Sequence, residues 1–335
     1  MTPLKIGIIG AGGIVGAHLP HLAARKDIEL TAISDVNPAG KATAEKFGIP
    51  NFFADYRELL PLVDAVLICV PTFLHASIAA ESLRLGKAVF CEKPLARTLE
   101  EADRMAQASC ESGAPLQVGF VRRFDAEWLA WRDAIQGDKI GRPVVWNDVS
   151  AISGPEAPWY FRDDQGGGPF LDGCIHNYDF ALHTFGPAQS VFCQGHTWRE
   201  NATAIDTGTA TIRFHAGDDL MLKWSWALPK GCSGTRVFEL LGPRGTLSWP
   251  GGVASDGRGR FVVNNGNQRE EIPFPAKALD EAFKAQMDEF IAVARRENAP
   301  RAGVQEGRAA LQLALAVLAS ARSGEVVHLE EVTSS

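Results

Sequence analysis

The chain has 335 residues, of which 46% are hydrophobic and 22% are charged, and its formal net charge is −7. This composition is typical of a globular protein with enough apolar residues for two domains. The acidic balance disfavours a general binder of nucleic acid or of anionic membranes. No apolar stretch reaches the roughly 20 residues that a membrane-spanning helix needs, so we expect neither nucleic acid nor a membrane among its partners.

The cysteines and the opening residues bear on the cellular compartment. The six cysteines lie far apart and form neither a CxxC nor a CxxC-plus-His pattern, so no zinc site and no disulfide framework are expected. The opening MTPLKIGIIG enters an apolar strand pattern directly, without the basic region and cleavable apolar run of a signal peptide. We therefore expect a cytoplasmic protein with reduced thiols.

The first part of the chain alternates strands with helices. Apolar runs predict strands at 4–9, 28–34, 65–70, 88–91 and 116–120. Helical patterns lie between them at about 13–25, 38–47, 75–85 and 98–112. Several of these strands are apolar on both sides, as in a parallel sheet covered by helices on both faces. The pattern predicts a doubly wound α/β domain over residues 1–123.

The rhythm then changes to consecutive strands. Strand-like segments lie at 144–152, 207–214, 220–228, 236–241 and 260–264, with a turn-rich, hairpin-like stretch at 250–259. Leu222, Trp224 and Trp226 alternate with Lys223 and Ser225, which predicts a mostly antiparallel sheet with two unlike faces. Helical patterns return at about 278–298 and 303–322, before a short strand at 326–329. Residues 124–335 are therefore expected to form a second, α+β domain.

The stretch KIGIIGAGGIVGAHLPHL changes from strand to helix at its glycines. Gly10 and Gly12 occupy the first two positions of the GxGxxG fingerprint. There the first glycine permits a tight turn, and the second lets the backbone approach a pyrophosphate at a helix N-terminus. Val15 stands in the third position and Gly16 comes one residue late. This departure predicts looser packing of helix on strand, or a helix start set by Gly13.

Asp35 follows the next predicted strand, about 20 residues beyond the glycines. A carboxylate at this position can accept hydrogen bonds from an adenosine ribose and would repel a 2′-phosphate. No arginine directly follows it, so NAD is favoured over NADP. Asp35 could instead cap the turn before the helical pattern near Pro38. Strand, glycines, helix and acid together predict a dinucleotide site and oxidoreduction as the leading chemistry.

Two further strand ends carry the motifs CVPTFLH and FCEKP. Ligands of open α/β sheets bind outside the carboxyl ends of the strands, and Lys93 lies in the second of these motifs. Taken alone, Lys93 could be a solvated surface charge. Its place in a turn at a strand end favours a functional role.

A third cluster, GGGPFLDGCIHNYDF, holds Asp172, His176 and Asp179 at spacings of four and three. If the segment after Gly173 is helical, His176 and Asp179 share one face and Asp172 lies at or before the N-cap. With Lys93 these residues could form a proton-transfer set. The structural alternatives are a helix cap for Asp172 and a core histidine for His176. No third His or Cys stands at a fitting spacing, so no metal is expected.

Together these motifs resemble the Gfo/Idh/MocA oxidoreductases, and the resemblance covers nearly the whole chain. It rests on GIIGAGGI, ISDVNP, CVPTFLH, CEKPLA, QVGFVRRF and GGGPFLDGCIHNYDF. It implies an N-terminal Rossmann domain over 1–123 that binds the dinucleotide. It also implies a C-terminal α+β domain over 124–335, with a large open, mainly antiparallel sheet that serves substrate binding and oligomerisation as a homodimer or homotetramer. The C-terminal helix could pack back on the first domain.

The resemblance also implies the site residues. The catalytic set would be Lys93 at the reacting hydroxyl and the nicotinamide ribose, Asp172 orienting the substrate, and His176 accepting the proton. The implied cofactor-binding residues are Gly10, Gly12, Gly13, Ile14, Asp35, Val70, Pro71, Thr72, His75, Glu92 and Lys93. The implied substrate-binding residues are Lys93, Gln117, Arg122, Trp159, Asp172 and His176. Trp159 stands in an aromatic loop where packing is the alternative to stacking on a sugar ring.

The activity implied is hydride transfer between NAD, or less favourably NADP, and a secondary alcohol of a sugar, cyclitol or sugar derivative. Two alternatives stay open. One is an enzyme that retains its nucleotide for aldose–aldose oxidoreduction or redox-assisted glycoside cleavage. The other is a non-catalytic nucleotide or sugar sensor, although a sensor has no need for Lys93 and His176 together.

Overall fold

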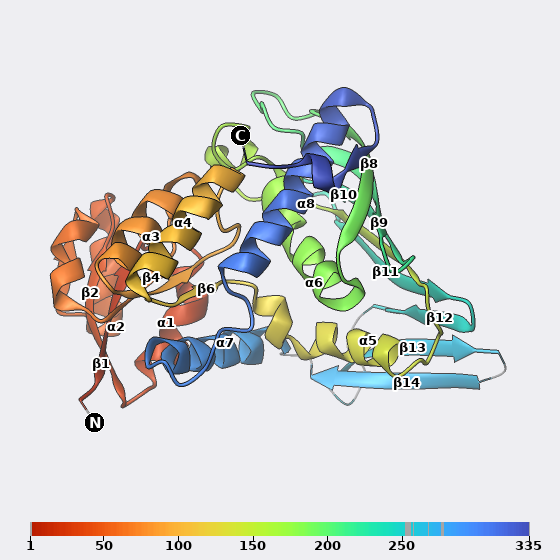
Figure 1. The fold of residues 1–335 in the computed structure, drawn as a ribbon. Coiled ribbons are helices and arrows are strands. Elements are labelled where there is room, and N and C mark those ends of the chain that lie inside the picture. Colours follow the sequence, from red (N-terminus) through yellow and green to blue (C-terminus); the bar gives the residue numbers. More distant parts are fainter. Residues whose placement is uncertain (1, 252–255, 257, 267, 276–277, 335) are drawn as a thin grey trace. The chain divides into compact units, whose positions relative to one another are not determined.

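The fold is that of a computed structural model, in which residues 2–251, 256, 258–266, 268–275 and 278–334 are described. The chain forms two compact units (Figure 1). The first comprises Met1–Phe124 and Asp280–Arg308, and the second comprises Asp125–Leu279 and Ala309–Ser335. Asp280–Arg308 belongs to the first unit, although all residues after 123 were expected in the second domain.

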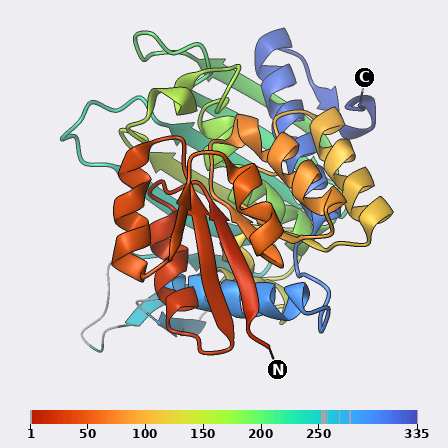
Figure 2. The same ribbon diagram turned by 90° about the vertical axis from the view of Figure 1, so that its left-hand side faces the viewer.

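A six-stranded parallel sheet forms the centre of the first unit, and its first strands face the viewer in Figure 2. Its order, β3-β2-β1-β4-β5-β6, is that of a doubly wound sheet, so the predicted fold of this part is confirmed. The strands are β1 Leu4–Ile9, β2 Ile28–Ser34, β3 Asn51–Phe53, β4 Ala65–Ile68, β5 Ala88–Cys91 and β6 Leu116–Val118. Strands β4 and β6 end earlier than predicted. Strand β3 is a half-buried edge strand of three residues, too short to show an apolar run in the sequence.

Five helices belong wholly or mainly to the first unit. They are α1 Val15–Ala23, α2 Lys41–Phe47, α3 His75–Arg84, α4 Leu99–Ser112 and α7 Ala278–Ala294. Short 3₁₀ turns lie at η1 Pro38–Gly40, η2 Tyr56–Glu58, η3 Leu60–Leu62, η4 Thr72–Leu74 and η5 Val121–Phe124.

Apolar side chains of α1 and α7 belong to one core cluster with the sheet, which explains why the segment containing α7 joins the first unit. Leu19 of α1 is fully buried, as are Met287 and Phe290 of α7. Val15 is 1% exposed within the same cluster. The looser packing expected from the loss of the third glycine is therefore wrong, because Val15 fills the space beside the strands. Helix α1 begins at Val15 itself.

The second unit is built on a nine-stranded sheet of order β14-β13-β12-β11-β7-β10-β9-β8-β15. The strands are β7 Val145–Ala151, β8 Ala188–His196, β9 Thr207–Phe214, β10 Asp219–Ser225, β11 Thr235–Gly242, β12 Gly245–Ser248, β13 Arg258–Asn265, β14 Gln268–Pro275 and β15 Val327–His328. Neighbouring strands are antiparallel except β7 and β10, which are parallel, so the mainly antiparallel sheet is confirmed. Strand β14 was not predicted because its charged, mostly exposed residues resemble a loop, as is common at a sheet edge.

The two faces of this sheet differ, as the alternation predicts. Leu222 is buried and Lys223 is exposed on neighbouring positions of β10. Ser225 is the exception, since it is buried rather than on the polar face. Its hydroxyl lies 2.8 Å from that of Thr207 on β9. A hydrogen-bond partner on the adjacent strand thus compensates for the burial of a hydroxyl that the alternation placed in solvent.

Helices cover the buried face. They are α5 Ala126–Gln136, α6 Ile175–Phe185 and the part of α8, Val304–Ser323, that follows Arg308. The remaining turns are η6 Pro158–Phe161, the π-helical η7 Pro169–Gly173 and η8 Leu329–Glu331. Trp131 of α5 packs against Trp146 of β7 and Phe180 of α6, with ring centroids 4.8 and 4.9 Å away. This aromatic contact joins helices and sheet into the core of the second unit.

Residues 252–255 and 257 of the expected hairpin end at 250–259 lie outside the described residues. Within the parts that are described, no helix combines the length and the apolar character needed to cross a membrane.

Candidate active site

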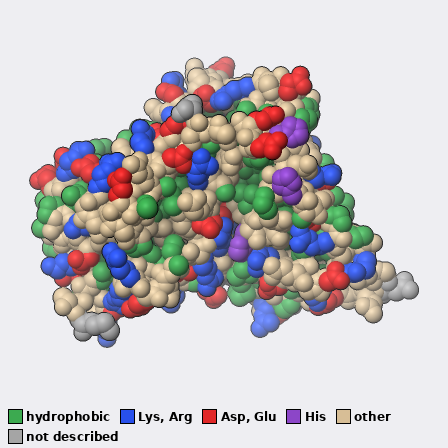
Figure 3. Space-filling view, in the orientation of Figure 1, with side chains coloured by type: hydrophobic (Ala, Val, Ile, Leu, Met, Phe, Trp, Pro, Cys, Tyr) green, Lys and Arg blue, Asp and Glu red, His purple; other side chains and the backbone are tan. Residues whose placement is uncertain are grey.

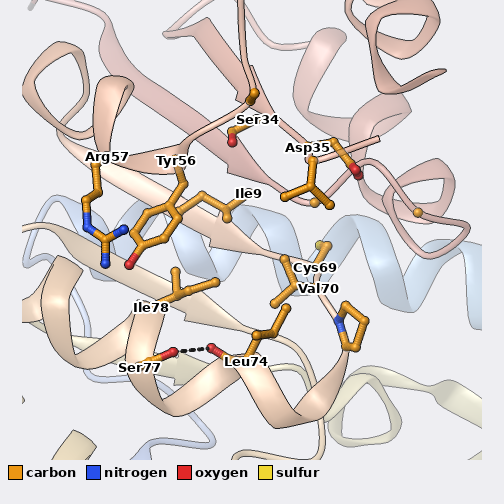
Figure 4. A pocket seen from close by; sticks show the side chains of 15 residues that line it. Ile9, Ser34, Asp35, Tyr56, Arg57, Cys69, Val70, Leu74, Ser77 and Ile78 are labelled. Atoms are coloured by element: carbon orange, nitrogen blue, oxygen red, sulfur yellow. Dashed lines mark hydrogen bonds between the residues drawn. The ribbon is translucent and has the colours of Figure 1, made fainter. Parts of the chain in front are cut away.

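A cavity of about 510 Å³ opens at the carboxyl ends of β1, β2 and β4 in the first unit (Figure 4). It is the location that doubly wound sheets use for ligands. Among the residues expected to bind the cofactor, those that line it are Gly10, Gly12, Asp35, Val70 and Pro71. Tyr56 and Arg57 of η2 also line it and were not predicted. Both residues follow the short strand β3, which is parallel to β2 and ends at the same edge of the sheet. Recognising β3 in the sequence would have indicated them.

The glycines of the first turn differ in what the protein requires of them. Gly10 has φ +94°, and a Cβ there would lie 2.6 Å from the carbonyl oxygen of Cys69, so only glycine fits. A Cβ at Gly12 or Gly13 would meet no atom within 4 Å. The protein's own packing therefore leaves the backbone at Gly12 and Gly13 open to close approach by a ligand.

The same turn leads into the N-terminus of α1. In the described structure no side chain caps this helix at Ile14, which is 38% exposed. The N–H groups of Val15, Gly16 and Ala17 donate to backbone carbonyls of the preceding turn at 3.2, 3.1 and 2.9 Å, so it is the helix dipole that favours an anion here. The open glycines and the uncapped helix fit the pyrophosphate of a dinucleotide.

Asp35 holds the glycine turn from the end of β2. Its Oδ2 accepts a hydrogen bond from the Ala11 N–H at 2.6 Å, and its Oδ1 accepts one from the Asn37 N–H at 2.7 Å. The N-cap of η1 is Asn37, not Asp35. Asp35 thus orients the turn after β2 while its carboxylate still lines the cavity, and a carboxylate has lone pairs left for ribose hydroxyls.

A basic and an aromatic side chain meet at another part of the cavity wall. The Arg57 guanidinium donates from Nε and Nη2 to the two carboxylate oxygens of Glu81, at 2.8 and 2.9 Å. The Tyr56 hydroxyl donates to Oε2 of Glu81 at 2.5 Å. Burial and this bond to an acidic neighbour raise the pKa of Tyr56 to about 12. Glu81 therefore holds both side chains, and it neutralises the cation that lines the cavity.

Lys93 and Glu92 form the turn after β5. Glu92 is 6% exposed, its Oε1 lies 2.7 Å from Nε2 of His18, and its Oε2 accepts the Lys93 N–H at 3.0 Å. Burial by itself raises the pKa of Glu92, but the hydrogen bond from His18 and the charges of His18 and Lys93 outweigh it, and the pKa is lowered. Glu92 is thus a buried carboxylate held in its ionised form. The Lys93 side chain is half-buried.

His75 and Thr72 do not line the cavity described above. Thr72 is 2% exposed at the start of η4, and His75 is 1% exposed at the start of α3. The His75 ring lies 2.7 Å from the Pro94 carbonyl oxygen through Nδ1 and 2.9 Å from the Val70 carbonyl oxygen through Nε2. Its recorded contacts are therefore with the protein, where it joins the turn after β4 to the turn that carries Lys93.

Gln117 and Arg122 also lie in the first unit. Gln117 on β6 is 1% exposed, and its amide donates to the Gln286 carbonyl of α7 at 3.3 Å. This bond ties the amide nitrogen to α7, whereas the buried Oε1 of Gln117 has no hydrogen-bond partner among the described residues. Arg122 is half-buried in η5.

Asp172 and His176 lie in the second unit, where the π-helical turn η7 leads into α6. Asp172 is 5% exposed, and its N–H donates to the Gly168 carbonyl at 2.9 Å. The N-cap position of α6 is Cys174, so the interpretation of Asp172 as the helix cap is wrong. His176 is half-buried in the first turn of α6, and Asp179 on the same face is 1% exposed.

Two residues beside this turn were missed by the sequence analysis. Trp224 of β10 packs so closely that a Cβ at Gly173 would lie 2.7 Å from its ring. The Trp224 indole donates to Oδ1 of Asp148 on β7 at 3.0 Å. A pair 76 residues apart, on parallel strands, leaves no local signal in the sequence. It supports the turn that carries Asp172.

Trp159 is half-buried in η6 and stacks on Tyr160, with ring centroids 3.7 Å apart. Tyr160 in turn packs edge-on against Trp226, at 6.0 Å. These contacts pack the Trp159 ring on its sequence neighbour, and its contact with substrate stays a prediction. Among the described residues no group of three or more His, Cys, Asp or Glu side chains could hold a metal ion. On the face of the molecule seen in Figure 3, acidic and basic side chains are interspersed.

Comparison with known proteins identifies the family. A model described as an oxidoreductase family with an NAD-binding Rossmann fold matches residues 4–120, and a GFO/IDH/MocA C-terminal domain model matches residues 128–248. The chain is 30% identical to the myo-inositol 2-dehydrogenase of Thermotoga maritima, over 98% of this chain and 99% of that protein. It is 26% identical to the scyllo-inositol 2-dehydrogenase (NAD(+)) of Bacillus subtilis, over 98% and 96%.

A solved structure, that of a probable dehydrogenase from Thermotoga maritima, agrees with this result. It matches with a TM-score of 0.81 at 29% identity and covers 98% of this chain and 100% of that chain. Both units are thus included in the likeness. The motifs, the doubly wound sheet and these matches agree: the chain belongs to the Gfo/Idh/MocA family and is an oxidoreductase with an NAD-binding Rossmann domain.

Proposed function

We propose that this protein is an NAD-dependent dehydrogenase acting on a secondary alcohol of a sugar, cyclitol or sugar derivative. The observation that carries the proposal is the cavity at the strand ends of the first unit, where Gly12 and Gly13 leave the backbone open and Asp35 lines the wall. The relatives named as inositol 2-dehydrogenases support a cyclic polyol as the substrate class.

The reaction divides the work between the nucleotide and the side chains. When bound, NAD⁺ supplies the hydride acceptor. The hydroxyl proton must leave together with the hydride, and His176 accepts it, since an imidazole ionises near neutral pH. The Lys93 ammonium stabilises the negative charge that develops on the hydroxyl oxygen. Asp172 accepts a hydrogen bond from a neighbouring hydroxyl and so orients the ring.

NAD is the proposed cofactor rather than NADP. The carboxylate of Asp35 lines the cavity and would repel a 2′-phosphate. Arg57 is a cation in the cavity wall that could attract such a phosphate, but both of its described bonds to Glu81 keep it neutralised. Asp35 and Glu81 thus both disfavour NADP. The Asp35 carboxylate repels the 2′-phosphate, and the Glu81 carboxylate engages the arginine that would attract it.

The open face of the nine-stranded sheet is the proposed contact with a second copy of the chain. Phe192, Met221, Val237 and Leu241 lie on this face and are 39–41% exposed. Thr211 stands between Met221 and Phe192 in the pairing of neighbouring strands, and the exposed Lys223 shares this face, so the apolar side chains stand among polar ones. Several large apolar side chains exposed on one sheet face favour its burial against another subunit. We expect a homodimer or homotetramer. Met221→Lys should shift the molar mass measured by light scattering toward that of the monomer.

The six cysteines are all free thiols, which supports the proposed cytoplasmic location, where thiols stay reduced.

The test is a screen of the purified protein at 340 nm with NAD⁺ and then NADP⁺, against inositols, aldoses and sugar acids. Reduction of NAD⁺ by one polyol, lost in Lys93→Ala, is the expected result. If no substrate reduces either nucleotide, mass spectrometry of the denatured protein decides between the two alternatives. Copurified NAD(H) would favour a retained cofactor, and a sugar-binding protein without it would favour a sensor.

A further inference from the structure

His18 is a buried polar side chain that the proposed mechanism does not use. It lies on α1, one turn after the glycine turn, and is 0% exposed. Its ring packs edge-on against Phe90 and Phe283, each with a centroid distance of 5.3 Å. Among the described residues, its Nδ1 has no hydrogen-bond partner. The recorded polar contact of His18 is the 2.7 Å contact of Nε2 with Oε1 of Glu92.

The Glu92 carboxylate is closely surrounded. A Cβ at Gly119 would lie 2.9 Å from Oε2, so the backbone after β6 passes directly beside the carboxylate. One oxygen faces His18 and the other accepts the N–H of Lys93. A buried carboxylate needs such donors, because burying an unpaired charge is costly. Without His18, the Glu92 carboxylate would keep the hydrogen bond from the Lys93 N–H but lose its contact with the imidazole. Its charge would then lie in an apolar site with one donor fewer.

The positions of these groups in the fold connect two functional turns. Helix α1 begins directly after the glycines at its N-terminus, while Glu92 and Lys93 follow β5. His75 holds the same turn from the other side, through the Pro94 carbonyl. Because α1 is rigid over one helical turn, a bond from His18 to Glu92 fixes the position of the Lys93 backbone relative to the glycine turn.

We propose that His18 is a positioning residue which, through Glu92, holds the Lys93 turn in register with the helix that receives the dinucleotide pyrophosphate. The inference deepens the proposed function and depends on it for the role of Lys93. It predicts that His18 affects turnover without contacting substrate or cofactor. It also predicts that the effect passes through the charge state of Glu92.

Three substitutions of His18 test this inference. Gln places a side-chain N–H near the site of the imidazole Nε2, Asn places one near Nδ1, and Leu provides none. His18→Leu is expected to lower kcat by up to about 10²-fold, the loss typical of a catalytic group displaced by about 1 Å. NAD affinity, measured by calorimetry, should change little. His18→Gln should restore most of the turnover and His18→Asn should not.

A spectroscopic measurement does not depend on turnover. In His18→Leu the burial of Glu92 is opposed by Lys93 but no longer by His18, so its carboxyl should protonate more readily and give an infrared C=O band that is absent from the wild type at the same pH. The band should be absent from His18→Gln, and from the double variant His18→Leu/Glu92→Gln. In the kinetic double-mutant cycle, His18→Leu should cost little once Glu92 is already Gln.

Wild-type kcat in His18→Leu, or losses at His18 and Glu92 that multiply, would overturn the inference. If His18→Leu does not fold, the two amide variants Gln and Asn, which differ by one methylene, still decide, since equal activities of the two contradict the role of Nε2. Normal turnover in Lys93→Ala would instead remove the proposed role of Lys93. In that case the infrared band would still show whether His18 controls Glu92.

Discussion

In the first unit, Gly10, Asp35 and Val70 follow three different strands, whereas in the second unit Asp172 and His176 come from one continuous turn and helix. The carboxyl ends of parallel strands meet at one edge of a sheet, so the topology alone brings distant residues to one cavity. In the second unit, sequence neighbours stay together and the sheet supplies support through Trp224. The placement of the first set of residues therefore depends on the fold as a whole, and that of the second set depends on the conformation of a few residues.

The largest expected effect concerns Lys93 and His176, and it tests whether residues of the two units serve one reaction. His176→Ala should lower turnover by about 10²–10⁴-fold, the usual contribution of proton transfer, and Lys93→Ala by about 10²–10³-fold, the usual contribution of one charge-stabilising donor, while NAD binding persists in both. Steady-state kinetics at saturating NAD⁺ and calorimetry with NAD⁺ measure the two properties. His183→Ala, exposed on the same helix as His176, is the matched control. Near-normal turnover in either active-site variant would contradict its assignment.

Two glycines of the first unit should separate folding from binding. Gly10→Ala should lower the free energy of unfolding by about 1–3 kcal/mol, because φ is +94° and the new Cβ would meet the Cys69 carbonyl. Gly12→Ala meets no atom within 4 Å, so it should unfold like the wild type and yet bind NAD more weakly. Denaturant unfolding and calorimetry check both. A Gly12→Ala protein with wild-type NAD affinity would rule out close approach of the pyrophosphate.

The corresponding glycine of the second unit is Gly173. In Gly173→Ala the new Cβ would lie 2.7 Å from the Trp224 ring and 2.8 Å from the Trp226 ring, so the turn or the indoles must move, at a cost of about 1–3 kcal/mol. Unlike Gly12→Ala, this change should lower kcat and leave NAD affinity intact. Gly173→Ala combined with Trp224→Phe, which removes part of one ring, should recover some turnover. No recovery would mean that the Trp226 ring, 2.8 Å from the new Cβ, and not Trp224 sets the position of the turn.

Cofactor choice should change at the wall of the first cavity. Glu81→Gln removes the charge that engages Arg57, so kcat/KM with NADP should rise by about tenfold, comparable to one charge-assisted hydrogen bond. Activity with NAD should change little. Glu81→Gln combined with Arg57→Ala is the control, and it should lose the gain. An unchanged NADP activity in Glu81→Gln would show that Arg57 does not reach a 2′-phosphate.

The smallest effect concerns an ion-pair network confined to the first unit. Hydrogen bonds from Arg25 and then Arg295 lower the pKa of Asp27 to about 2, against the opposing effect of burial. Because the folded-state pKa lies below the ordinary 3.8, the stabilisation is present above pH 4 and is lost as the pH falls toward 2. Asp27→Asn should therefore destabilise by less than about 1 kcal/mol at pH 7. Unfolding curves at pH 7 and pH 2 should show this difference vanishing at the lower pH.

The same contrast between the units explains what the sequence could predict. Strands with Gly10 and Asp35 at their ends follow from local patterns, and so does the doubly wound order. Helix α5 was missed although Trp128, Trp131 and Ile135 show helical spacing. The contacts of His18 with Glu92 and of Trp224 with Asp148 join residues 74 and 76 positions apart. No local pattern encodes such pairs, because they form only when the sheets assemble.

The path of the chain limits how this protein can be divided. It leaves the first unit after Phe124, returns at Asp280 and leaves again after Arg308, within α8. A fragment ending at Phe124 would lack Met287, Phe290 and Ile291, which are buried in its core cluster. A single cut after Phe124 would therefore separate the nucleotide-binding sheet from part of its own core. In the gene, the second unit is largely an insertion between two parts of the first.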